Sequence, residues 1–129
     1  MADPVQGGLV ALERILRYLK GYPRLLWRFP WQGAQSTVQA YCYSDWAGCR
    51  RTIRSTSGGV VRIGNDSLCH WSRTQATVAL SSAEAELNGS LTGYSELLFL
   101  KNMIEEIDGE LQAEVLGDSS ARRGIRTPP

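Results

Sequence analysis

The apolar residues near the start of the chain recur at helical intervals. Four leucines stand three or four residues apart: Leu9, Leu12, Leu16 and Leu19. Because residues at this spacing share one face of a helix, the pattern predicts an amphipathic helix. Gly21 and Pro23 predict its end, since glycine adopts the left-handed cap conformation and proline cannot continue a helix. Residues 25–29 form a short candidate strand.

The middle of the chain changes to the alternating pattern of strands. Residues 37–44 are rich in β-branched and aromatic side chains, and their alternation places both tyrosines and Asp45 on one side. Two further short strands, 60–63 and 68–71, flank a Gly-Asn-Asp turn and predict a hairpin. This part of the chain therefore predicts three antiparallel strands.

A helical pattern returns after residue 80. Ser81 and Glu84 have the spacing of a capping box, which predicts that a long helix begins there. One face of this helix carries large residues and is expected to be buried: Leu87, Leu91, Tyr94 and Leu98. The adjacent face is mostly small: Ala83, Glu86, Ser90, Gly93 and Leu97. Small residues let a helix approach a sheet closely, so we expect Glu86 near the end of a strand.

The last part of the chain predicts one more strand. Asp108 and Gly109 end the long helix, and residues 113–117 read as a strand with Asp118 at its carboxyl end. Another helix is expected from Ser119 onward. The order of elements favours an α/β fold with three antiparallel strands, a long helix across the sheet and a fourth strand parallel to the first.

The composition indicates one compact domain without a membrane span. The chain has 129 residues, of which 43% are hydrophobic and 21% charged, and no run approaches the roughly 18 apolar residues of a membrane helix. The N-terminus lacks the pattern of a signal peptide, so we expect a soluble protein of the cytoplasm or nucleus. Three cysteines without paired spacing argue against a disulfide framework.

Charge is unevenly distributed although the net charge is only +1. Residues 1–80 carry ten lysines and arginines against four acidic residues, whereas residues 81–129 carry four against nine. The basic first part is suited to face a polyanion such as nucleic acid. A solvated surface with chance clustering explains the same distribution, so charge alone leaves both interpretations open.

Three acidic residues fall at distinctive points of the predicted elements. Asp45 and Asp118 follow strands, and Glu86 lies on the helix face of small residues. Separate carboxylates that converge in space suit a hard divalent cation such as Mg²⁺, which takes oxygen ligands. Spacing alone does not establish that convergence, and surface solvation is the common role of acidic residues.

Four specific runs of residues follow one another along the chain: YSDWAGC at 43–49, RSTSGG at 54–59, WSRTQ at 71–75 and TVALSSAEAE at 77–86. In this order they resemble the successive motifs of the ribonuclease H domains of copia-type LTR retrotransposon Pol polyproteins, with WSRTQ fitting the tract before the last motif. GDSSA at 117–121 resembles the next motif more weakly. Residues 12–21 are similar to the helical stretch that joins reverse transcriptase to this domain.

The resemblance implies a ribonuclease H-like fold and hydrolysis of the RNA strand of RNA–DNA hybrids with two Mg²⁺ ions, for which Mn²⁺ can substitute. The family's carboxylates carry over to Asp45, which would bridge both ions, and to Glu86 and Asp118, which would hold the ion on the leaving-group side. Glu84 lies in the same motif, but Glu86 precedes the apolar Leu87 as the family's glutamate does. Glu84 keeps the role of capping the helix.

A basic and hydroxyl-rich loop follows the first strand, and its side chains are candidates for contacts with hybrid phosphates: Arg50, Arg51, Arg54, Ser55, Thr56 and Ser57. Guanidinium and hydroxyl donors position a duplex without reading its sequence. The structural alternative is that residues 55–59 build the turn into the next strand, which Gly58 and Gly59 suit.

The expected organisation is a helical connector from a reverse transcriptase region at 1–30 and a ribonuclease H-like domain at 31–129, with the reverse transcriptase and integrase regions of the same polyprotein as partners. No acidic residue follows Asp118 to supply the family's fourth carboxylate, so the domain is expected to be incomplete and poorly active. A catalytically inactive remnant that binds nucleic acid or only folds is the alternative. A related DNA-cutting integrase is disfavoured, because integrases place their acids in different local motifs.

Overall fold

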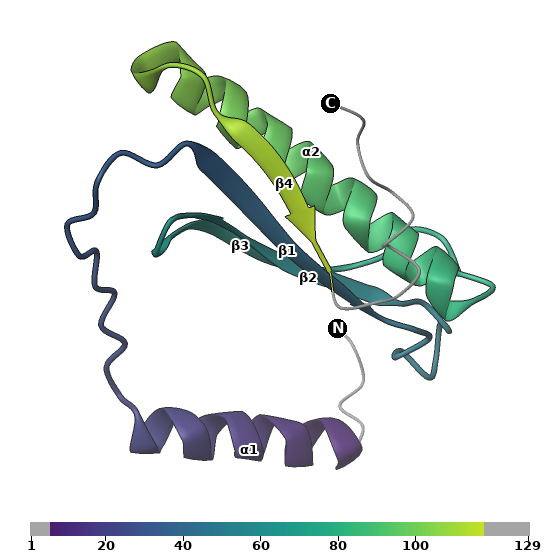
Figure 1. Cartoon of the computed structure of the whole chain (residues 1–129). Helices are drawn as coiled ribbons and strands as arrows, with labels where there is room; N and C mark the ends of the chain where they lie inside the picture. Colours follow the sequence, from purple (N-terminus) through teal and green to yellow (C-terminus); the bar gives the residue numbers. More distant parts are fainter. Residues whose placement is uncertain (1–5, 118–129) are drawn as a thin grey trace.

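A computed structural model describes residues 6–117 of the chain (Figure 1). The elements follow in the order α1 (Gln6–Gly21), β1 (Thr37–Asp45), β2 (Thr56–Ile63), β3 (Asp66–Thr74), α2 (Ser82–Asp108) and β4 (Gln112–Leu116). The strands form one sheet in the order β3-β2-β1-β4. β1 to β3 pair antiparallel, and β4 pairs parallel to β1. The predicted α/β architecture, with a mixed sheet and one long helix, is confirmed.

β1 lies inside the sheet and contributes the centre of the core. Val38, Ala40 and Cys42 on its inner face are buried, whereas Tyr41 and Tyr43 on the other face are exposed. The core is completed from other elements by Val61, Trp71 and Leu97. The predicted alternation along this strand is confirmed, and it leaves Asp45 exposed at the carboxyl end.

The hairpin of β2 and β3 is confirmed, but both strands are longer than the sequence indicates. Gly64 in the connecting turn has a φ of 56°, which glycine adopts without strain. Gly58 and Gly59 belong to β2 instead of a turn. A β-carbon on Gly58 would overlap the Tyr43 ring, and one on Gly59 would overlap the Trp71 ring. The two glycines therefore make room for aromatic rings on opposite faces of the sheet.

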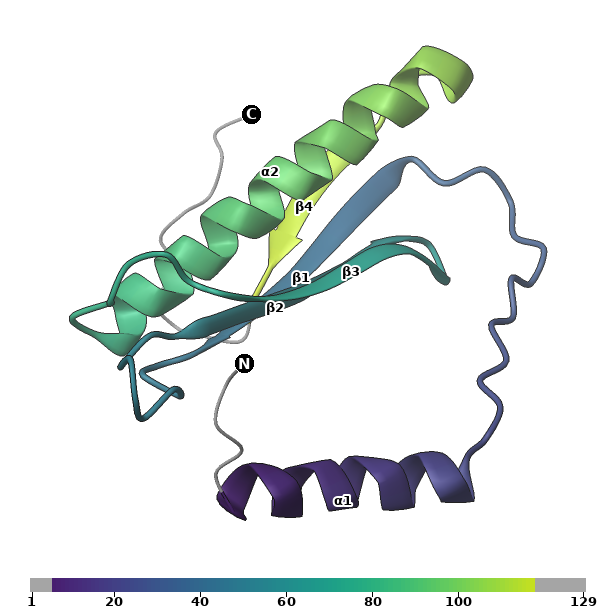
Figure 2. The ribbon, with the colours of Figure 1, turned by 180° about the vertical axis from the view of Figure 1, so that it is seen from behind.

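α2 covers one face of the sheet (Figure 2). Its buried ridge consists of small residues and one leucine: Ala85, Gly89, Gly93 and Leu97. The expectation that Leu87, Leu91 and Tyr94 would be buried is wrong, because they are 42%, 57% and 40% exposed. The small residues allow the closest approach of helix to sheet, and the larger side chains are left on the flank.

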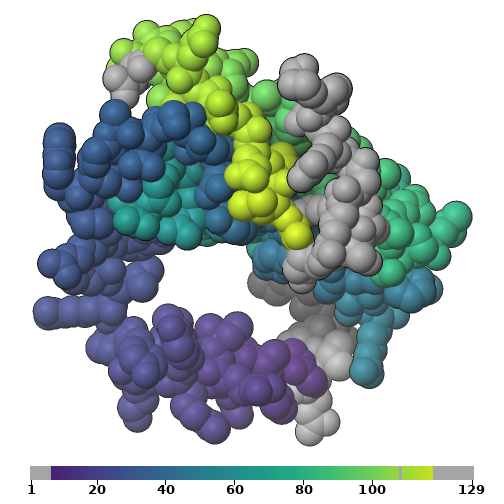
Figure 3. Space-filling model, viewed as in Figure 1, coloured from purple at the N-terminus to yellow at the C-terminus, as the bar shows by residue number. Residues whose placement is uncertain are grey.

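α1 is confirmed as a helix, but it packs against no other helix or strand of the described chain. Figure 3 shows open space between α1 and the body formed by the sheet and α2. Its leucines are about half exposed. Neither described helix combines the length and the apolar character that crossing a membrane requires.

The segment between α1 and β1 contains no strand, so the strand predicted at 25–29 is wrong. Leu25 and Leu26 are 82% and 87% exposed, and no described strand pairs with them. Trp27 and Gln32 are among the residues of this segment that contact the sheet or its β2–β3 turn. The Trp27 ring stacks on His70 at 6.0 Å between centroids, and the Gln32 amide donates to the Ile63 carbonyl at 3.1 Å and to Asp66 Oδ2 at 2.9 Å.

Candidate functional site

Asp45 ends β1, and its two carboxylate oxygens lie near different segments, one at the start of β2 and the other at the loop that follows β1. Its Oδ1 accepts a hydrogen bond from the backbone N–H of Thr56, the residue paired with it on β2. A β-carbon on Gly48 would overlap Oδ2, so the glycine gives this oxygen its space. The backbone therefore fixes the orientation of a carboxylate that is also exposed to solvent.

The loop of residues 46–55 is held by its own hydrogen bonds. The N–H of Cys49 donates to the Arg54 carbonyl at 3.2 Å, and the N–H of Ile53 donates to the Cys49 carbonyl at 2.7 Å. The Trp46 indole donates to the Ala79 carbonyl at 3.1 Å and so joins the loop to the segment before α2. Hydrogen bonds from Thr52 are the main cause that lowers the pKa of the Cys49 thiol.

The start of α2 follows the prediction closely. Ser81 is the N-cap, and its Oγ accepts the Glu84 N–H at 3.2 Å. The Glu84 carboxylate accepts from the N–H of Leu80 at 2.8 Å, one residue before the partner expected in a capping box. The Ser81 half of the predicted capping box is therefore confirmed, whereas Glu84 bonds the residue before the N-cap and not the N-cap itself.

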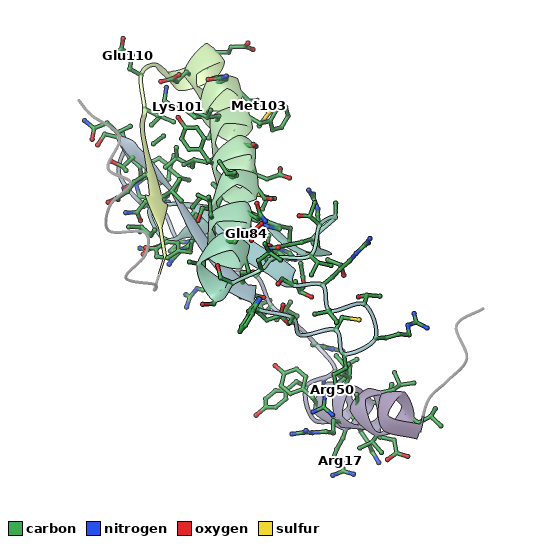
Figure 4. All side chains as sticks on the ribbon, turned by 90° about the vertical axis from the view of Figure 1, so that its right-hand side faces the viewer. Arg17, Arg50, Glu84, Lys101, Met103 and Glu110 are labelled. Carbon is green, nitrogen blue, oxygen red and sulfur yellow. The ribbon has the colours of Figure 1, made fainter. Side chains whose placement is uncertain are left out.

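Glu86 is half buried on the same end of α2. Three residues later, Gly89 lies against the carboxyl end of β1. A β-carbon there would stand 3.4 Å from the Tyr43 carbonyl oxygen and 3.5 Å from Ser44 Cβ. The turn that carries Glu86 is therefore next to the strand end that carries Asp45. Figure 4 shows Glu84 at this end of α2 and Lys101 and Glu110 at the other.

A buried glutamine connects these two elements. Gln75 is 9% exposed, and its Nε2 donates to Ser57 Oγ at 2.7 Å, to the Ala85 carbonyl at 2.8 Å and to Ser44 Oγ at 3.1 Å. From the sequence, Gln75 is only the last residue of the tract at 71–75 and has no predicted role. A lone glutamine carries no periodic or spacing signal, so only the tertiary structure identifies it.

Of the three predicted acids, two are described. Asp45 and Glu86 lie on neighbouring elements at one end of the sheet, while Asp118 lies outside the described residues. Within 6–117 no three His, Cys, Asp or Glu side chains gather as a metal site would need. Carboxylate oxygens suit Mg²⁺, so the side chains of Asp45 and Glu86 have the chemistry that such an ion requires.

The six predicted phosphate-contacting residues differ in their exposure to solvent. The three arginines, Arg50, Arg51 and Arg54, are exposed. Ser55 and Ser57 are 0% and 3% exposed, and their hydroxyls accept from the Ala47 N–H and from Gln75. Thr56 lies between them, half buried, with its backbone bonded to Asp45. This arrangement favours the structural alternative for the two serines and leaves the arginines available to a ligand.

Comparison with known proteins finds three informative relatives. The chain is 35% identical over 99 residues to the uncharacterized mitochondrial protein AtMg00810 of Arabidopsis thaliana, a match of 75% of the chain and 40% of that protein. It is 35% identical over 107 residues to the retrovirus-related Pol polyprotein from transposon RE1 of the same plant. It is 38% identical over 85 residues to the secreted RxLR effector protein 161 of Plasmopara viticola.

These matches cover most of the chain but a small part of the Pol polyprotein. The RE1 match includes 83% of the chain and 7% of the polyprotein, and the effector match includes 66% and 59%. No family model matches the chain, and no solved structure does. The chain is therefore similar to a segment of retrotransposon Pol polyproteins.

Proposed function

We propose that this chain is the ribonuclease H part of a retrotransposon Pol polyprotein and hydrolyses the RNA strand of RNA–DNA hybrids. The similarity to the RE1 Pol polyprotein supports the polyprotein context. The observation that carries the proposal is that Asp45, at the carboxyl end of β1, and Glu86, on the adjoining turn of α2, come from separate elements to one end of the sheet.

Asp45 and Glu86 are the proposed ligands of Mg²⁺, with Asp118 as the third. Bound Mg²⁺ ions supply activation of water and stabilisation of the leaving oxygen. The N–H of Thr56 holds one oxygen of Asp45 and so orients the carboxylate before any ion binds. Mn²⁺ is the proposed substitute, because it takes the same oxygen ligands.

The hybrid is proposed to lie against the loop of residues 46–55, which begins directly after Asp45. The loop presents Arg50, Arg51 and Arg54 to solvent and is braced by its internal hydrogen bonds. Exposed guanidinium groups on a fixed loop can contact phosphates without distinguishing bases. Such contacts would align the RNA backbone with Asp45 for any hybrid sequence.

The test is cleavage of a hybrid labelled on both strands, with Mg²⁺ and with a chelator. The assay is run on the full chain. We expect Mg²⁺-dependent cutting of the RNA strand alone and its nearly complete loss in Asp45→Asn, which removes the charge with little change in size. Glu106→Gln, which removes an exposed charge from the far end of α2, is the matched control.

Two results would contradict the proposal. Cutting that continues in Asp45→Asn at the rate of Glu106→Gln would remove Asp45 from the site. Hybrid binding without Mg²⁺-dependent cutting would favour an inactive remnant that binds nucleic acid.

A further inference from the structure

The three acceptors of the Gln75 side chain lie on three different elements. Ser44 belongs to β1, Ser57 to β2, and Ala85 to the first turn of α2. The Gln75 backbone N–H also donates to the Ser55 carbonyl at 2.8 Å. One buried residue therefore ties the end of β1, the start of β2 and the start of α2 to one another.

Two of these acceptors directly precede the proposed metal ligands. Ser44 is followed by Asp45, and Ala85 is followed by Glu86. The Ala85 carbonyl can only accept, so it requires the nitrogen of the amide and fixes which way the amide points. The Ser44 hydroxyl accepts from the same nitrogen. The Gln75 amide thus links the end of β1, which carries Asp45, to the first turn of α2, which carries Glu86.

We propose that Gln75 is a positioning residue that holds Asp45 and Glu86 at the spacing a shared divalent cation requires. The inference rests on the proposed function, because it assigns Gln75 to the metal site of that function. Gln75 itself touches neither ion nor substrate.

The proposal follows from how closely ligand geometry is set in metal sites. Ligands must be held within about 0.5 Å of the productive arrangement by side chains that are themselves locked in place. Gln75 is held in place, since it is buried and the two hydrogens of its amide nitrogen are shared among three acceptors. Residues that orient metal ligands from behind change metal affinity by about 10- to 100-fold when they are replaced.

The test measures binding of Mn²⁺ alone to the full chain by electron paramagnetic resonance and by paramagnetic broadening of backbone amide signals. Wild-type protein should show broadening centred on Asp45 and Glu86. Gln75→Met keeps the length of the side chain and removes its hydrogen bonds, and it should weaken Mn²⁺ binding about tenfold. Ser44→Ala removes the link to β1 alone and should weaken binding by a smaller factor.

A stability control separates positioning from general loss of structure. Val38→Ala removes a fully buried side chain at the opposite end of β1. It should lower the melting temperature as much as the Gln75 variant or more, while its Mn²⁺ affinity stays within about twofold of wild type, since it leaves the site end intact. Should Gln75→Met fail to fold, Ser44→Ala gives the same comparison.

The outcomes distinguish this inference from the proposed function. Wild-type binding that Asp45→Asn abolishes but that Gln75→Met and Ser44→Ala leave unchanged would overturn the role of Gln75 alone. If Val38→Ala weakened Mn²⁺ binding as much as Gln75→Met does, Gln75 would contribute only to the stability of the fold. No Mn²⁺ binding at Asp45 and Glu86 in the wild-type chain would overturn both proposals.

Discussion

Gly93 of α2 lies so close to Cys42 of β1 that a β-carbon on the glycine would overlap the cysteine sulfur. The contact is at the centre of the core, where Cys42 is buried and joined by Trp71 and Leu97. It sets how near α2 comes to the sheet, and hence how near the turn bearing Glu86 comes to the end of β1.

Gly93→Ala should destabilise the fold, although alanine is the better helix former. In an exposed helix the same change stabilises by about 1 kcal/mol. Here the added methyl group must displace Cys42 or the helix, and overpacking of this kind costs about 1–3 kcal/mol. Urea unfolding measures the change in free energy. Gly8→Ala in α1 is the control, because nothing lies within 4 Å of its β-carbon.

Removing the sulfur should rescue Gly93→Ala. The next nearest atoms to the new β-carbon are Cys42 Cβ and Trp71 Cζ2, both at 3.4 Å, an ordinary contact distance. In a double-mutant cycle, the variant carrying both Gly93→Ala and Cys42→Ala should lose less unfolding free energy than the two single variants lose together. We expect the difference to be about 1 kcal/mol or more. If the losses of the two single variants simply add, the Cys42 sulfur is not the atom that the new methyl group displaces.

The cysteines should differ in their reactivity toward iodoacetamide near neutral pH. Hydrogen bonds from Thr52 lower the pKa of Cys49, so more of its reactive thiolate is present. Burial raises the pKa of Cys69 and decreases its thiolate fraction. Peptide mapping after partial labelling should find Cys49 modified first, and the midpoint of its rate against pH should lie below the usual 9.0. Faster labelling of Cys69 would contradict this order.

Glu105 should contribute stability that depends on pH. The Leu111 N–H and then Lys101 lower the pKa of its carboxyl below the usual 4.5. A lowered folded-state pKa stabilises the protein above the unfolded value, and this contribution is lost as pH falls through the folded value. Glu105→Gln should therefore be less stable than wild type at neutral pH, with the difference vanishing in acid. A difference independent of pH would exclude this linkage, and Glu106→Gln serves as the control for charge.

Local signals along the chain predict most of the elements. The leucine period of α1, the alternation of β1, the Gly64 turn and the Ser81 cap each act over a few residues, so their outcome does not depend on distant parts. The strand expected at 25–29 failed for the opposite reason. Its composition suits a strand, but a strand exists only with a partner, and no described strand pairs with these residues.

The face that α2 presents to the sheet illustrates a second limit. Hydrophobicity selects the large residues Leu87 and Leu91 for burial, whereas the sheet accepts Gly89, which the sequence did not single out, and Gly93, which lies on the face of small residues expected to approach the sheet. The size of the side chain decided the outcome, and the size that fits depends on what lies opposite, as Cys42 lies opposite Gly93. The role of Gln75 was missed for the same reason, because it comes from three acceptors up to 31 residues away in the chain.

The arginines of the loop after β1 should dominate the salt dependence of hybrid binding. Each phosphate contact releases counterions, so replacing Arg50, Arg51 and Arg54 with glutamine should weaken binding. The slope of log affinity against log salt should flatten by about 0.7–0.9 for each arginine that bound a phosphate. Fluorescence anisotropy with a labelled hybrid, at a series of salt concentrations, measures both the affinity and this slope. Removing three charges from α1, at Arg14, Arg17 and Lys20, is the matched control and should change the slope less. An unaltered slope in the loop variant would assign the loop to structure alone.

The two glutamates at the start of α2 should separate stability from metal binding. Glu84 accepts the Leu80 N–H and lies at the positive end of the helix, so Glu84→Ala should lower the free energy of unfolding by about 0.3–1 kcal/mol. Its Mn²⁺ affinity should stay within about twofold of wild type, since it leaves the proposed ligands intact. Glu86→Gln keeps the size of the side chain and should change stability little, while weakening Mn²⁺ binding about tenfold or more through loss of an anionic ligand.

Chemical denaturation and Mn²⁺ titration of the two variants give the comparison directly. The resemblance of residues 77–86 to a family motif leaves both glutamates as candidates, and the hydrogen bond from Leu80 commits Glu84 to the helix end. If Glu84→Ala lost the affinity and Glu86→Gln lost the stability, the two roles would have to be exchanged. The metal site would then lie closer to the loop before α2 than to the end of β1, and the positioning role of Gln75 through Ala85 would fail with it.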